Sequence, residues 1–393
     1  MPTQRQLFLQ HLAPTNDIPL MLEVAHANGH YLYDVEGRGY FDLICGIGVS
    51  SLGHRHPEVM EAIHAQTERY LHVMVYGEFV QAPQVRFAHA LAEALPEGLD
   101  SVYFTNSGTE AAEGAMKLAK RVTARPHFVA CQNAYHGSTQ GALSLAGGEW
   151  FRRNYRPLPG PVTNIRYNCL HDLRHIDHRT AAVFVEAVQG EAGAREPVPG
   201  YLKALRQRCN ETGALLVVDE IQSGMGRTGT PFAFTPEFFV PDVLLLGKAL
   251  GAGMPLGAFI ASRERMQQLA DNPVLGHITT FGGHPVSCAA GLAGWNAMQR
   301  AGLPESAVQK GKKLREGLLG LRQVAAVSGR GLMRAVHVGS FEKVQHTIHR
   351  LLEEGFVSDW FLFNDQAIRL APPLTIDDND IDHIVEGFRK ALA

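Results

Sequence analysis

Cysteine is scarce in this chain and is not arranged for either of its usual structural uses. Five cysteines, an odd number, are spread over 393 residues, and no two of them form a Cys-x-x-Cys pair. A disulfide framework is built from an even, regularly spaced set, and a structural zinc site needs clustered thiolates. The composition indicates neither and favours a protein of the reducing cytoplasm.

The chain also lacks an excess of charge of either sign and any long apolar run. Its 36 basic and 39 acidic residues leave a net charge of −3, which gives no field that would gather nucleic acid or anionic lipid. No run approaches the roughly 20 apolar residues that span a bilayer, and the first residues lack the plan of a signal peptide. We expect a soluble protein whose partners are small molecules, with no nucleic acid and no membrane among them.

Histidine is plentiful by contrast, but no group of histidines predicts a metal site. His54 and His56 lie in a glycine-rich loop without a third ligand nearby. His171, His175 and His178 have the spacing of one helical face, yet aspartate and arginine residues interleave with them, which favours a solvated helix end. We therefore expect no bound metal.

Short apolar runs bounded by turn residues alternate with helical patterns through the middle of the chain. Such runs are typical of strands buried on both faces of a parallel sheet. The length allows two or three domains, and the composition changes near Pro285, where a long helical run begins. We predict an α/β fold with a domain boundary close to Pro285. The predicted sheet strands include residues 127–131, 181–186, 214–218 and 243–246.

Two of these strands are followed by polar residues that can meet at one edge of the sheet. Asp219 directly follows the strand 214–218, and Lys248 follows the strand 243–246 after one glycine. Asp219 precedes Lys248 by 29 residues, about the length of one strand-crossover-strand unit. Open α/β sheets bind their ligands at the carboxyl edge of the strands, so both side chains are expected in one crevice.

A lysine and an aspartate in one crevice indicate pyridoxal phosphate as the cofactor. A lysine amine forms a Schiff base with the aldehyde of this cofactor, and a carboxylate keeps the ring nitrogen protonated so that the ring can accept electrons. A lone lysine is more simply interpreted as a snorkelling side chain, and a lone aspartate as a turn residue. The combination of the two favours the cofactor.

Two further segments are suited to the phosphate and the ring of such a cofactor. Ser107, Gly108 and Thr109 lie at a predicted helix start, where free backbone N–H groups, two hydroxyls and the helix dipole favour an anion. Tyr135 and His136 follow the strand 127–131, where an aromatic side chain can cover a flat ring. Ordinary helix capping and an ordinary core aromatic remain the alternatives.

Seven short motifs, in order along the chain, resemble those of one enzyme family. Together they cover nearly the whole chain, and each is weak alone. The chain is similar to fold-type I, class III pyridoxal-phosphate aminotransferases, the group that includes ornithine, acetylornithine, 4-aminobutyrate and putrescine transaminases. The motifs are residues 106–111 (NSGTEA), 135–137 (YHG), 186–193 (EAVQGEAG), 219–222 (DEIQ), 247–249 (GKA), 280–283 (TFGG) and 368–373 (IRLAPP).

The resemblance implies a two-domain fold and a cytoplasmic homodimer with shared active sites. The large cofactor-binding domain, with a mostly parallel sheet between helices, would span residues 51–285. A smaller α+β domain would combine residues 1–50 with residues 286–393. Thr280 would reach the cofactor phosphate of the other subunit.

The resemblance also implies a role for each residue of the site. Lys248 would form the Schiff base and carry the proton, and Asp219 would pair with the ring nitrogen. Arg369 would bind the substrate α-carboxylate, and Glu191 would pair with Arg369 when a terminal amine occupies the site. The remaining cofactor contacts would be Ser107, Gly108 and Thr109 at the phosphate, Tyr135 and His136 at the ring, Gln222 at the ring hydroxyl, and Glu186.

The chain departs from the family pattern at three positions. Several amino-acid-specific members have an arginine at the position of Ser138, so a charge that reads a carboxylate is missing here. Residues 141–144 and 151–158 look more like the putrescine transaminase pattern, although Arg152 or Arg153 could restore carboxylate recognition. His284 stands where asparagine is usual, and Ala187 where proline is usual.

We predict a transaminase, class EC 2.6.1.-, that moves the terminal amino group of an amino acid such as acetylornithine or ornithine to 2-oxoglutarate. A diamine transaminase acting on putrescine-like donors is the first alternative. The second is a racemase or aminomutase on the same scaffold, which would keep Lys248 and Asp219 without needing 2-oxoglutarate. A binding protein without turnover would be expected to have lost Lys248.

Overall fold

A seven-stranded sheet forms the centre of the larger lobe in the computed structural model, which describes residues 2–393. Its strand order is β4-β10-β9-β8-β7-β5-β6, and every neighbouring pair is parallel except those that involve β10. The predicted α/β class with a mostly parallel sheet is confirmed. The strands are β4 (Ser101–Thr105), β5 (His127–Cys131), β6 (Val162–Ile165), β7 (Thr180–Glu186), β8 (Leu215–Asp219), β9 (Val243–Leu246) and β10 (Gly257–Ala261).

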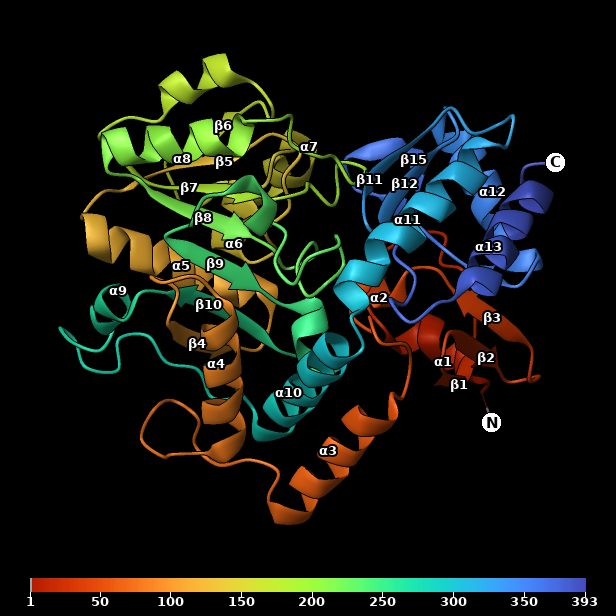
Figure 1. Ribbon diagram of the computed structural model, residues 1–393, viewed down its shortest axis with the longest axis horizontal. Coiled ribbons are helices and arrows are strands. Elements are labelled where there is room, and N and C mark those ends of the chain that lie inside the picture. Colours follow the sequence, from red (N-terminus) through yellow and green to blue (C-terminus); the bar gives the residue numbers. More distant parts are fainter. Residues whose placement is uncertain (1) are drawn as a thin grey trace.

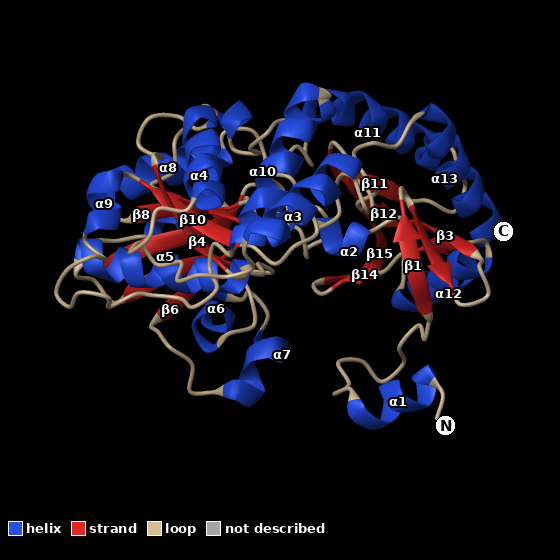
Figure 2. Cartoon of the chain, turned by 90° about the horizontal axis from the view of Figure 1, so that it is seen from below, coloured by secondary structure: helices blue, strands red, loops and turns tan. Residues whose placement is uncertain are grey.

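Helices cover both faces of this sheet, as Figures 1 and 2 show. The strands β7, β8, β9 and β10 are buried along their whole length, which explains why they read as continuous apolar runs. The helices of this lobe are α3 (Pro57–Arg69), α4 (Ala82–Ala94), α5 (Gly108–Thr123), α6 (Gln140–Leu145), α7 (Glu149–Arg152), α8 (Tyr201–Thr212), α9 (Arg263–Gln267) and α10 (Pro285–Arg300). Short 3₁₀ turns lie at η1 (Arg153–Tyr155), η2 (Leu170–His175), η3 (Thr235–Glu237) and η4 (Lys248–Gly251).

Helix α5 lies close to the sheet because one of its faces consists of small residues. Ala111, Ala112 and Ala115 are fully buried on that face. A Cβ added to Gly114 would lie 2.4 Å from the ring of Phe259 on β10, so nothing larger than glycine fits there without movement. The close packing fixes the N-terminus of α5 against the carboxyl edge of the sheet.

The smaller lobe combines both ends of the chain (Figure 1). Strand β3 pairs in parallel with β13, so residues near position 41 lie beside residues near position 356. A second four-stranded sheet has the order β11-β12-β15-β14. The strands are β1 (Val24–Asn28), β2 (Tyr31–Asp34), β3 (Gly39–Asp42), β11 (Ala326–Arg330), β12 (Met333–His337), β13 (Phe356–Val357), β14 (Trp360–Phe361) and β15 (Asn364–Leu370). The helices are α1 (Gln4–His11), α2 (Cys45–Gly48), α11 (Leu303–Leu319), α12 (Phe341–Glu353) and α13 (Asp378–Ala391).

Helix α10 connects the two lobes. It packs mainly against α3 and α4 of the larger lobe and also contacts α11 of the smaller one. The predicted boundary at Pro285, where α10 begins, stays a prediction. His284 caps this helix, because its Nδ1 accepts a hydrogen bond from the backbone N–H of Val286 at 3.3 Å. Asparagine is a favoured residue at such a cap, so histidine at this position keeps the capping contact.

Helix α1 has no buried residue and lies apart from the other helices in Figure 2. None of the helices within residues 2–393 combines the length and apolarity that a bilayer crossing requires.

Candidate active site

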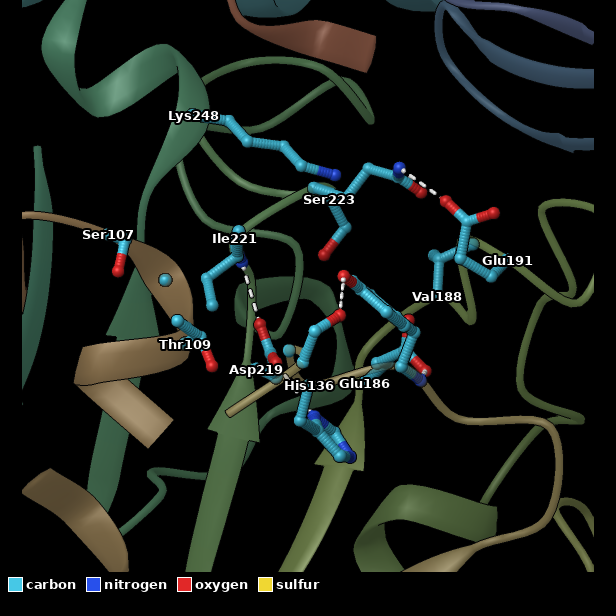
Figure 3. A pocket seen from close by; sticks show the side chains of 15 residues that line it. Ser107, Thr109, His136, Glu186, Val188, Glu191, Asp219, Ile221, Ser223 and Lys248 are labelled. Carbon is cyan, nitrogen blue, oxygen red and sulfur yellow. Dashed lines mark hydrogen bonds and ion pairs between the residues drawn. The ribbon is translucent and has the colours of Figure 1, made fainter. Parts of the chain in front are cut away.

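A cavity of about 300 Å³ lies at the carboxyl ends of β7, β8 and β9. The sheet places side chains there because all three strands are parallel and end at one edge. Figure 3 shows the lining side chains, which come from five separate segments of the chain. The lining residues are Ser107, Gly108, Thr109, Tyr135, His136, Gly137, Ser138, Glu186, Val188, Glu191, Asp219, Ile221, Gln222, Ser223 and Lys248.

Lys248 directly follows Gly247, and its side chain points into this cavity (Figure 3). Its backbone is left-handed, with φ of 49°, a conformation that is uncommon for residues other than glycine and turns the chain sharply after β9. Within residues 2–393 its amine makes no hydrogen bond or ion pair. Burial lowers the pKa of Lys248 to about 8, although the carboxylate of Glu191 opposes this shift. A reactive fraction of neutral amine is therefore present near neutral pH.

Asp219 forms a buried pair with His136 below the lysine. Its Oδ2 lies 2.7 Å from Nδ1 of His136, and its Oδ1 accepts a hydrogen bond from the backbone N–H of Ile221 at 2.9 Å. Burial alone would lower the pKa of His136, but the hydrogen bond and charge of Asp219 outweigh burial and raise this pKa. The carboxylate of Asp219 is therefore held in one orientation by two donors.

Glu186 lies beside Asp219, because the two residues are register partners on β7 and β8. Its Oε1 accepts from the backbone N–H of Gly190 at 2.9 Å, and its Oε2 accepts from that of Tyr135 at 3.4 Å. Burial, with a contribution from the charge of Asp219, raises the pKa of Glu186 to about 8. The side chain of Glu186 thus connects the loop that contains Tyr135 to the loop that contains Gly190.

The segment that was predicted to bind an anion forms the N-terminus of α5 and lines the cavity. Ser107 is the N-cap residue, and its hydroxyl accepts from the backbone N–H of Glu110 at 3.3 Å. A Cβ on Gly108 would lie 2.6 Å from Cδ1 of Ile221, so a larger residue would require the side chain of Ile221 to move. The hydroxyl of Thr109 lies 2.8 Å from that of Thr139. Helix dipole and backbone N–H groups favour an anion at this position.

The residues present fit pyridoxal phosphate. The cavity has a helix start suited to an anion, a buried carboxylate at its floor and a lysine amine that has no partner among the described residues. Gln222 Oε1 and Ser223 Oγ are buried and have no hydrogen-bond partner within residues 2–393, which is typical of polar groups that face a ligand. A polar cofactor with one phosphate matches this set of donors and acceptors.

A strong ion pair lies at the opposite end of the cavity. The guanidinium of Arg369 binds both carboxylate oxygens of Glu191, at 3.0 and 2.8 Å. Glu191 lines the cavity, whereas Arg369 lies behind it and is 4% exposed. Asp359, which the sequence analysis did not single out, accepts from Nε of Arg369 at 2.7 Å. The ring of Phe361 lies 4.5 Å from the guanidinium carbon.

A left-handed turn from the N-terminal part of the chain borders the same arginine. The residues of α2, Cys45–Gly48, all have positive φ angles, between 51° and 76°. Ile47 and Gly48 line a small cavity together with Gln222 and Arg369. A β-branched residue at φ of 64° is an outlier, and such strain is found mostly where surrounding contacts impose it.

The loop arginines that could have replaced the missing charge at Ser138 are engaged elsewhere. Arg152 donates to Oδ1 of Asn164 at 2.7 Å and to the carbonyl of Ser144 at 3.3 Å. The guanidinium of Arg153 stacks over the ring of Trp150 at 3.8 Å. The hydroxyl of Ser138 lies 3.0 Å from that of Tyr135. The mouth of the cavity therefore carries no arginine in this arrangement.

Thr280 does not join the cavity. It is exposed, in a segment between α9 and α10, and it precedes the exposed Phe281. The other predicted cofactor residues meet at the cavity, and Ile221, Val188 and Ser223 join them there. Ile221 and Val188 lie within the predicted 219–222 and 186–193 motifs, and Ser223 directly follows the first of these. Nothing in the structure explains Ala187.

A lysine and an aspartate at neighbouring strand ends, facing an anion-binding helix start, define a pyridoxal-phosphate enzyme of fold type I. Residues 12–392 match the family model for class-III aminotransferases. The chain belongs to this family. It is a pyridoxal-phosphate-dependent aminotransferase, as predicted from the sequence.

Similar proteins agree with this assignment. The chain is 42% identical over 368 residues to the acetylornithine aminotransferase of Methanopyrus kandleri, which covers 93% of this chain and 92% of the relative. The ornithine aminotransferase of Toxoplasma gondii superposes with a TM-score of 0.91 at 30% identity, covering 98% of this chain and 92% of that one. A thermostable (S)-enantioselective omega-transaminase from Thermomicrobium roseum has a TM-score of 0.91 at 28% identity, covering 98% and 96%.

Proposed function

We propose that this aminotransferase takes the terminal amino group of an amino acid such as N-acetylornithine or ornithine and delivers it to 2-oxoglutarate. The Arg369–Glu191 pair at the substrate end of the cavity is the observation that carries this proposal. For substrates with a carboxylate near the reacting carbon, the pair provides the guanidinium of Arg369. For substrates without such a carboxylate, Glu191 neutralises the guanidinium and covers it. The similarity to an acetylornithine aminotransferase supports the same donor class.

The residues of the cofactor end divide the work among them. Pyridoxal phosphate, when bound, supplies the aldehyde that exchanges amines and a ring that accepts the electrons of a broken C–H bond. Lys248 would hold the cofactor covalently and would move the proton at the reacting carbon, a task that suits an amine with a pKa of about 8. Asp219 would keep the ring nitrogen protonated, and His136 holds Asp219 in place.

The remaining contacts bind and orient the cofactor. Ser107, Gly108 and Thr109 would hold the phosphate at the start of α5. Tyr135 would cover the ring, and Gln222, whose Oε1 has no partner within residues 2–393, would bind the ring hydroxyl. Glu186 fixes the loop of Tyr135 through a backbone hydrogen bond.

Arg369 and Glu191 adapt the cavity to two kinds of substrate. Glu191 covers the guanidinium while a terminal amine reacts, so no charge is left unpaired in the cavity. When 2-oxoglutarate or glutamate enters, its α-carboxylate replaces Glu191 and binds the planar guanidinium with two hydrogen bonds.

Diamines such as putrescine form a second donor class that a specific observation favours. Ser138 carries no charge, and Arg152 and Arg153 are held away from the cavity mouth. A donor that lacks a carboxylate avoids placing an anion where no cation is available to pair with it.

A half-reaction screen tests both donor classes. The absorbance of the enzyme-bound cofactor is followed while ornithine, N-acetylornithine, putrescine, 4-aminobutyrate and β-alanine are added singly. Fast bleaching by N-acetylornithine or ornithine supports the first proposal, and faster bleaching by putrescine supports the second. Bleaching by none of them, together with an active glutamate half-reaction, would contradict both.

We infer that the working unit is a homodimer in the cytoplasm. Large apolar side chains are exposed in two neighbouring segments, 71–80 and 274–281, among them Leu71, Val80, Val274 and Phe281. These segments border a cavity of about 610 Å³, and exposed apolar patches of this kind mark protein interfaces. Thr280 lies in the second segment, where it reaches the phosphate site of the other subunit. Val80→Glu should yield monomers in sedimentation equilibrium, and an unchanged mass would contradict the proposed interface.

A further inference from the structure

The guanidinium of Arg369 has two acidic partners on two different edges. Glu191 accepts from the Nη1 and Nη2 atoms, and Asp359 accepts from Nε at 2.7 Å. A guanidinium presents its five N–H donors in a rigid plane, so fixing one edge determines where the other edge points. The two carboxylates therefore constrain one another's geometry through the arginine.

The edge of the guanidinium that Glu191 occupies is the one that faces the cavity. Glu191 lines the cavity, whereas Asp359 does not. A carboxylate that enters the cavity can meet Arg369 only through the edge that Glu191 occupies. Exchange at this site must therefore leave the bond between Asp359 and Nε in place.

Asp359 is held by the same short hairpin that carries the arginine. Its backbone carbonyl accepts from the N–H of Arg369 at 2.9 Å, and Ser358 Oγ donates to the carbonyl of Arg369 at 2.8 Å. The carbonyl of Trp360 accepts from Nη2 at 3.0 Å. The side chain and backbone of Arg369 are thus anchored on the side away from the cavity.

Apart from the arginine, the side chain of Glu191 makes two contacts within residues 2–393. They are with the amide of Gln222 at 3.3 Å and the backbone N–H of Leu362 at 3.2 Å. Both contacts are at the long end of the range for hydrogen bonds. Once a substrate carboxylate takes its place at the arginine, Glu191 is therefore held by long contacts alone.

We propose that Asp359 is a positioning residue that fixes the plane of Arg369, so that the cavity-facing edge is presented in the same place whether Glu191 or a substrate carboxylate occupies it. This inference rests on the proposed function, since it names what prepares Arg369 for 2-oxoglutarate. A misplacement of about 1 Å at a recognition group can cost about 100-fold in rate. Without an Nε partner, the guanidinium would keep the Trp360 carbonyl and the ring of Phe361 as its contacts away from the cavity, and neither of them fixes the Nε edge.

The test uses the holoenzyme and three variants, Asp359→Ala, Asp359→Asn and the control Asp365→Ala. Asp365 is exposed on β15 and its side chain makes no hydrogen bond within residues 2–393. Binding of glutarate, a dicarboxylate that cannot react, is measured by calorimetry. KM for 2-oxoglutarate and the rate of the putrescine half-reaction are measured beside it, and thermal unfolding reports on the fold.

We expect Asp359→Ala to raise the Kd of glutarate and the KM for 2-oxoglutarate about 10-fold or more. Asp359→Asn keeps an oxygen that can accept from Nε, so its loss should be clearly smaller. The putrescine half-reaction should stay within about two-fold, because it does not use the exposed edge of the guanidinium. Asp365→Ala should match wild type in every measurement.

Several outcomes would overturn the inference. Tighter glutarate binding in Asp359→Ala would mean that Asp359 acts only as a repelling charge. Equal losses in Asp359→Ala and Asp359→Asn, or equal losses with glutarate and putrescine, would contradict an orienting role. If the wild-type enzyme itself neither binds glutarate nor uses 2-oxoglutarate, the proposed function fails. This failure is seen without any substitution, whereas a failure of the positioning role of Asp359 is seen only in the variants.

Discussion

The two ends of the active-site cavity are built in different ways. At the cofactor end, Lys248, Asp219 and Glu186 follow or end buried strands of one sheet, and the helix start at Ser107 packs against the same sheet edge. At the substrate end, Glu191 comes from a loop of the larger lobe and Arg369 from a hairpin of the smaller one. Their contact is an ion pair between lobes.

This difference separates a fixed site from an exchangeable one. Sheet hydrogen bonds hold the cofactor end in one arrangement, which preorganises groups that must act on every turnover. Under the proposed function the substrate end binds two kinds of substrate, and an ion pair with one replaceable partner would permit that exchange. Substitutions at the first end should therefore affect all substrates, and those at the second end only substrates with a carboxylate.

The largest effect is expected for Lys248→Ala. Steady-state turnover should fall by about 1,000-fold or more for every substrate, because no other group moves the proton at the reacting carbon. The variant should still bind the cofactor through phosphate and ring contacts, as absorbance after gel filtration would show. In wild type, borohydride reduction and peptide mapping should place the cofactor label on Lys248. A label on another lysine would remove the basis for the comparison.

Arg369→Lys should produce the next largest effect, confined to one half of the reaction. A lysine cannot form the planar pair of hydrogen bonds with a carboxylate, so kcat/KM for glutamate should fall about 30- to 100-fold. The putrescine half-reaction serves as the internal control and should change little. Equal losses with both substrates would indicate a general structural defect and would erase the proposed distinction between the two ends.

A smaller effect is expected on the pKa of Lys248, because the charge of Glu191 at the substrate end acts on this amine at the cofactor end. The rate at which the cofactor-free enzyme captures pyridoxal phosphate should rise with pH, since the neutral amine of Lys248 is the reactive form. The midpoint should lie near the lowered pKa of about 8, in place of the ordinary 10.5. Glu191 raises this pKa, so Glu191→Gln should move the midpoint to lower pH. Stopped-flow absorbance between about pH 6 and about pH 10 measures both, and a wild-type rate still rising steeply at the upper end of this range would be inconsistent with a buried amine of lowered pKa.

The smallest effects on activity are expected at the cavity mouth. Arg153→Ala should change the KM for N-acetylornithine or putrescine by no more than about two-fold, because the guanidinium stacks on Trp150 and contacts no residue of the cavity. Arg152→Ala should lower the melting temperature, because Asn164 and the carbonyl of Ser144 lose their partner, without changing donor preference. A selective rise in KM for N-acetylornithine in either variant would show that a loop arginine enters the substrate end during catalysis.

The cofactor end could be predicted from sequence because its residues follow a local rule. An apolar strand followed by a polar residue identifies Asp219 and Lys248, and parallel strands bring such residues to one edge whatever the rest of the chain does. The helix start at Ser107 obeys a similar rule. The strand 127–131 and the helix that begins at Pro285 also lie where the pattern placed them.

The substrate end could not be predicted in this way. Glu191 and Arg369 were identified only through resemblance, because their pairing depends on how two lobes pack. Asp359 lies between two strands of two residues each, which leave no periodic signal. The directions of Arg152 and Arg153 depend on Asn164 and Trp150, and spacing along the chain carries no information about such contacts.

The left-handed turn at Cys45–Gly48 borders the substrate end, and its stability depends on the chirality of the residues that form it. A Cβ on Gly48 would meet no atom within 4 Å, and one on Gly46 would make only an ordinary contact. Replacing either glycine by L-alanine would therefore cause no clash, and its cost, about 1–2 kcal/mol, would come from handedness alone. A D-alanine introduced there by chemical ligation has the opposite preference and should stabilise the turn. The mirror-image residue, not the natural one, is the better fit to this part of the fold.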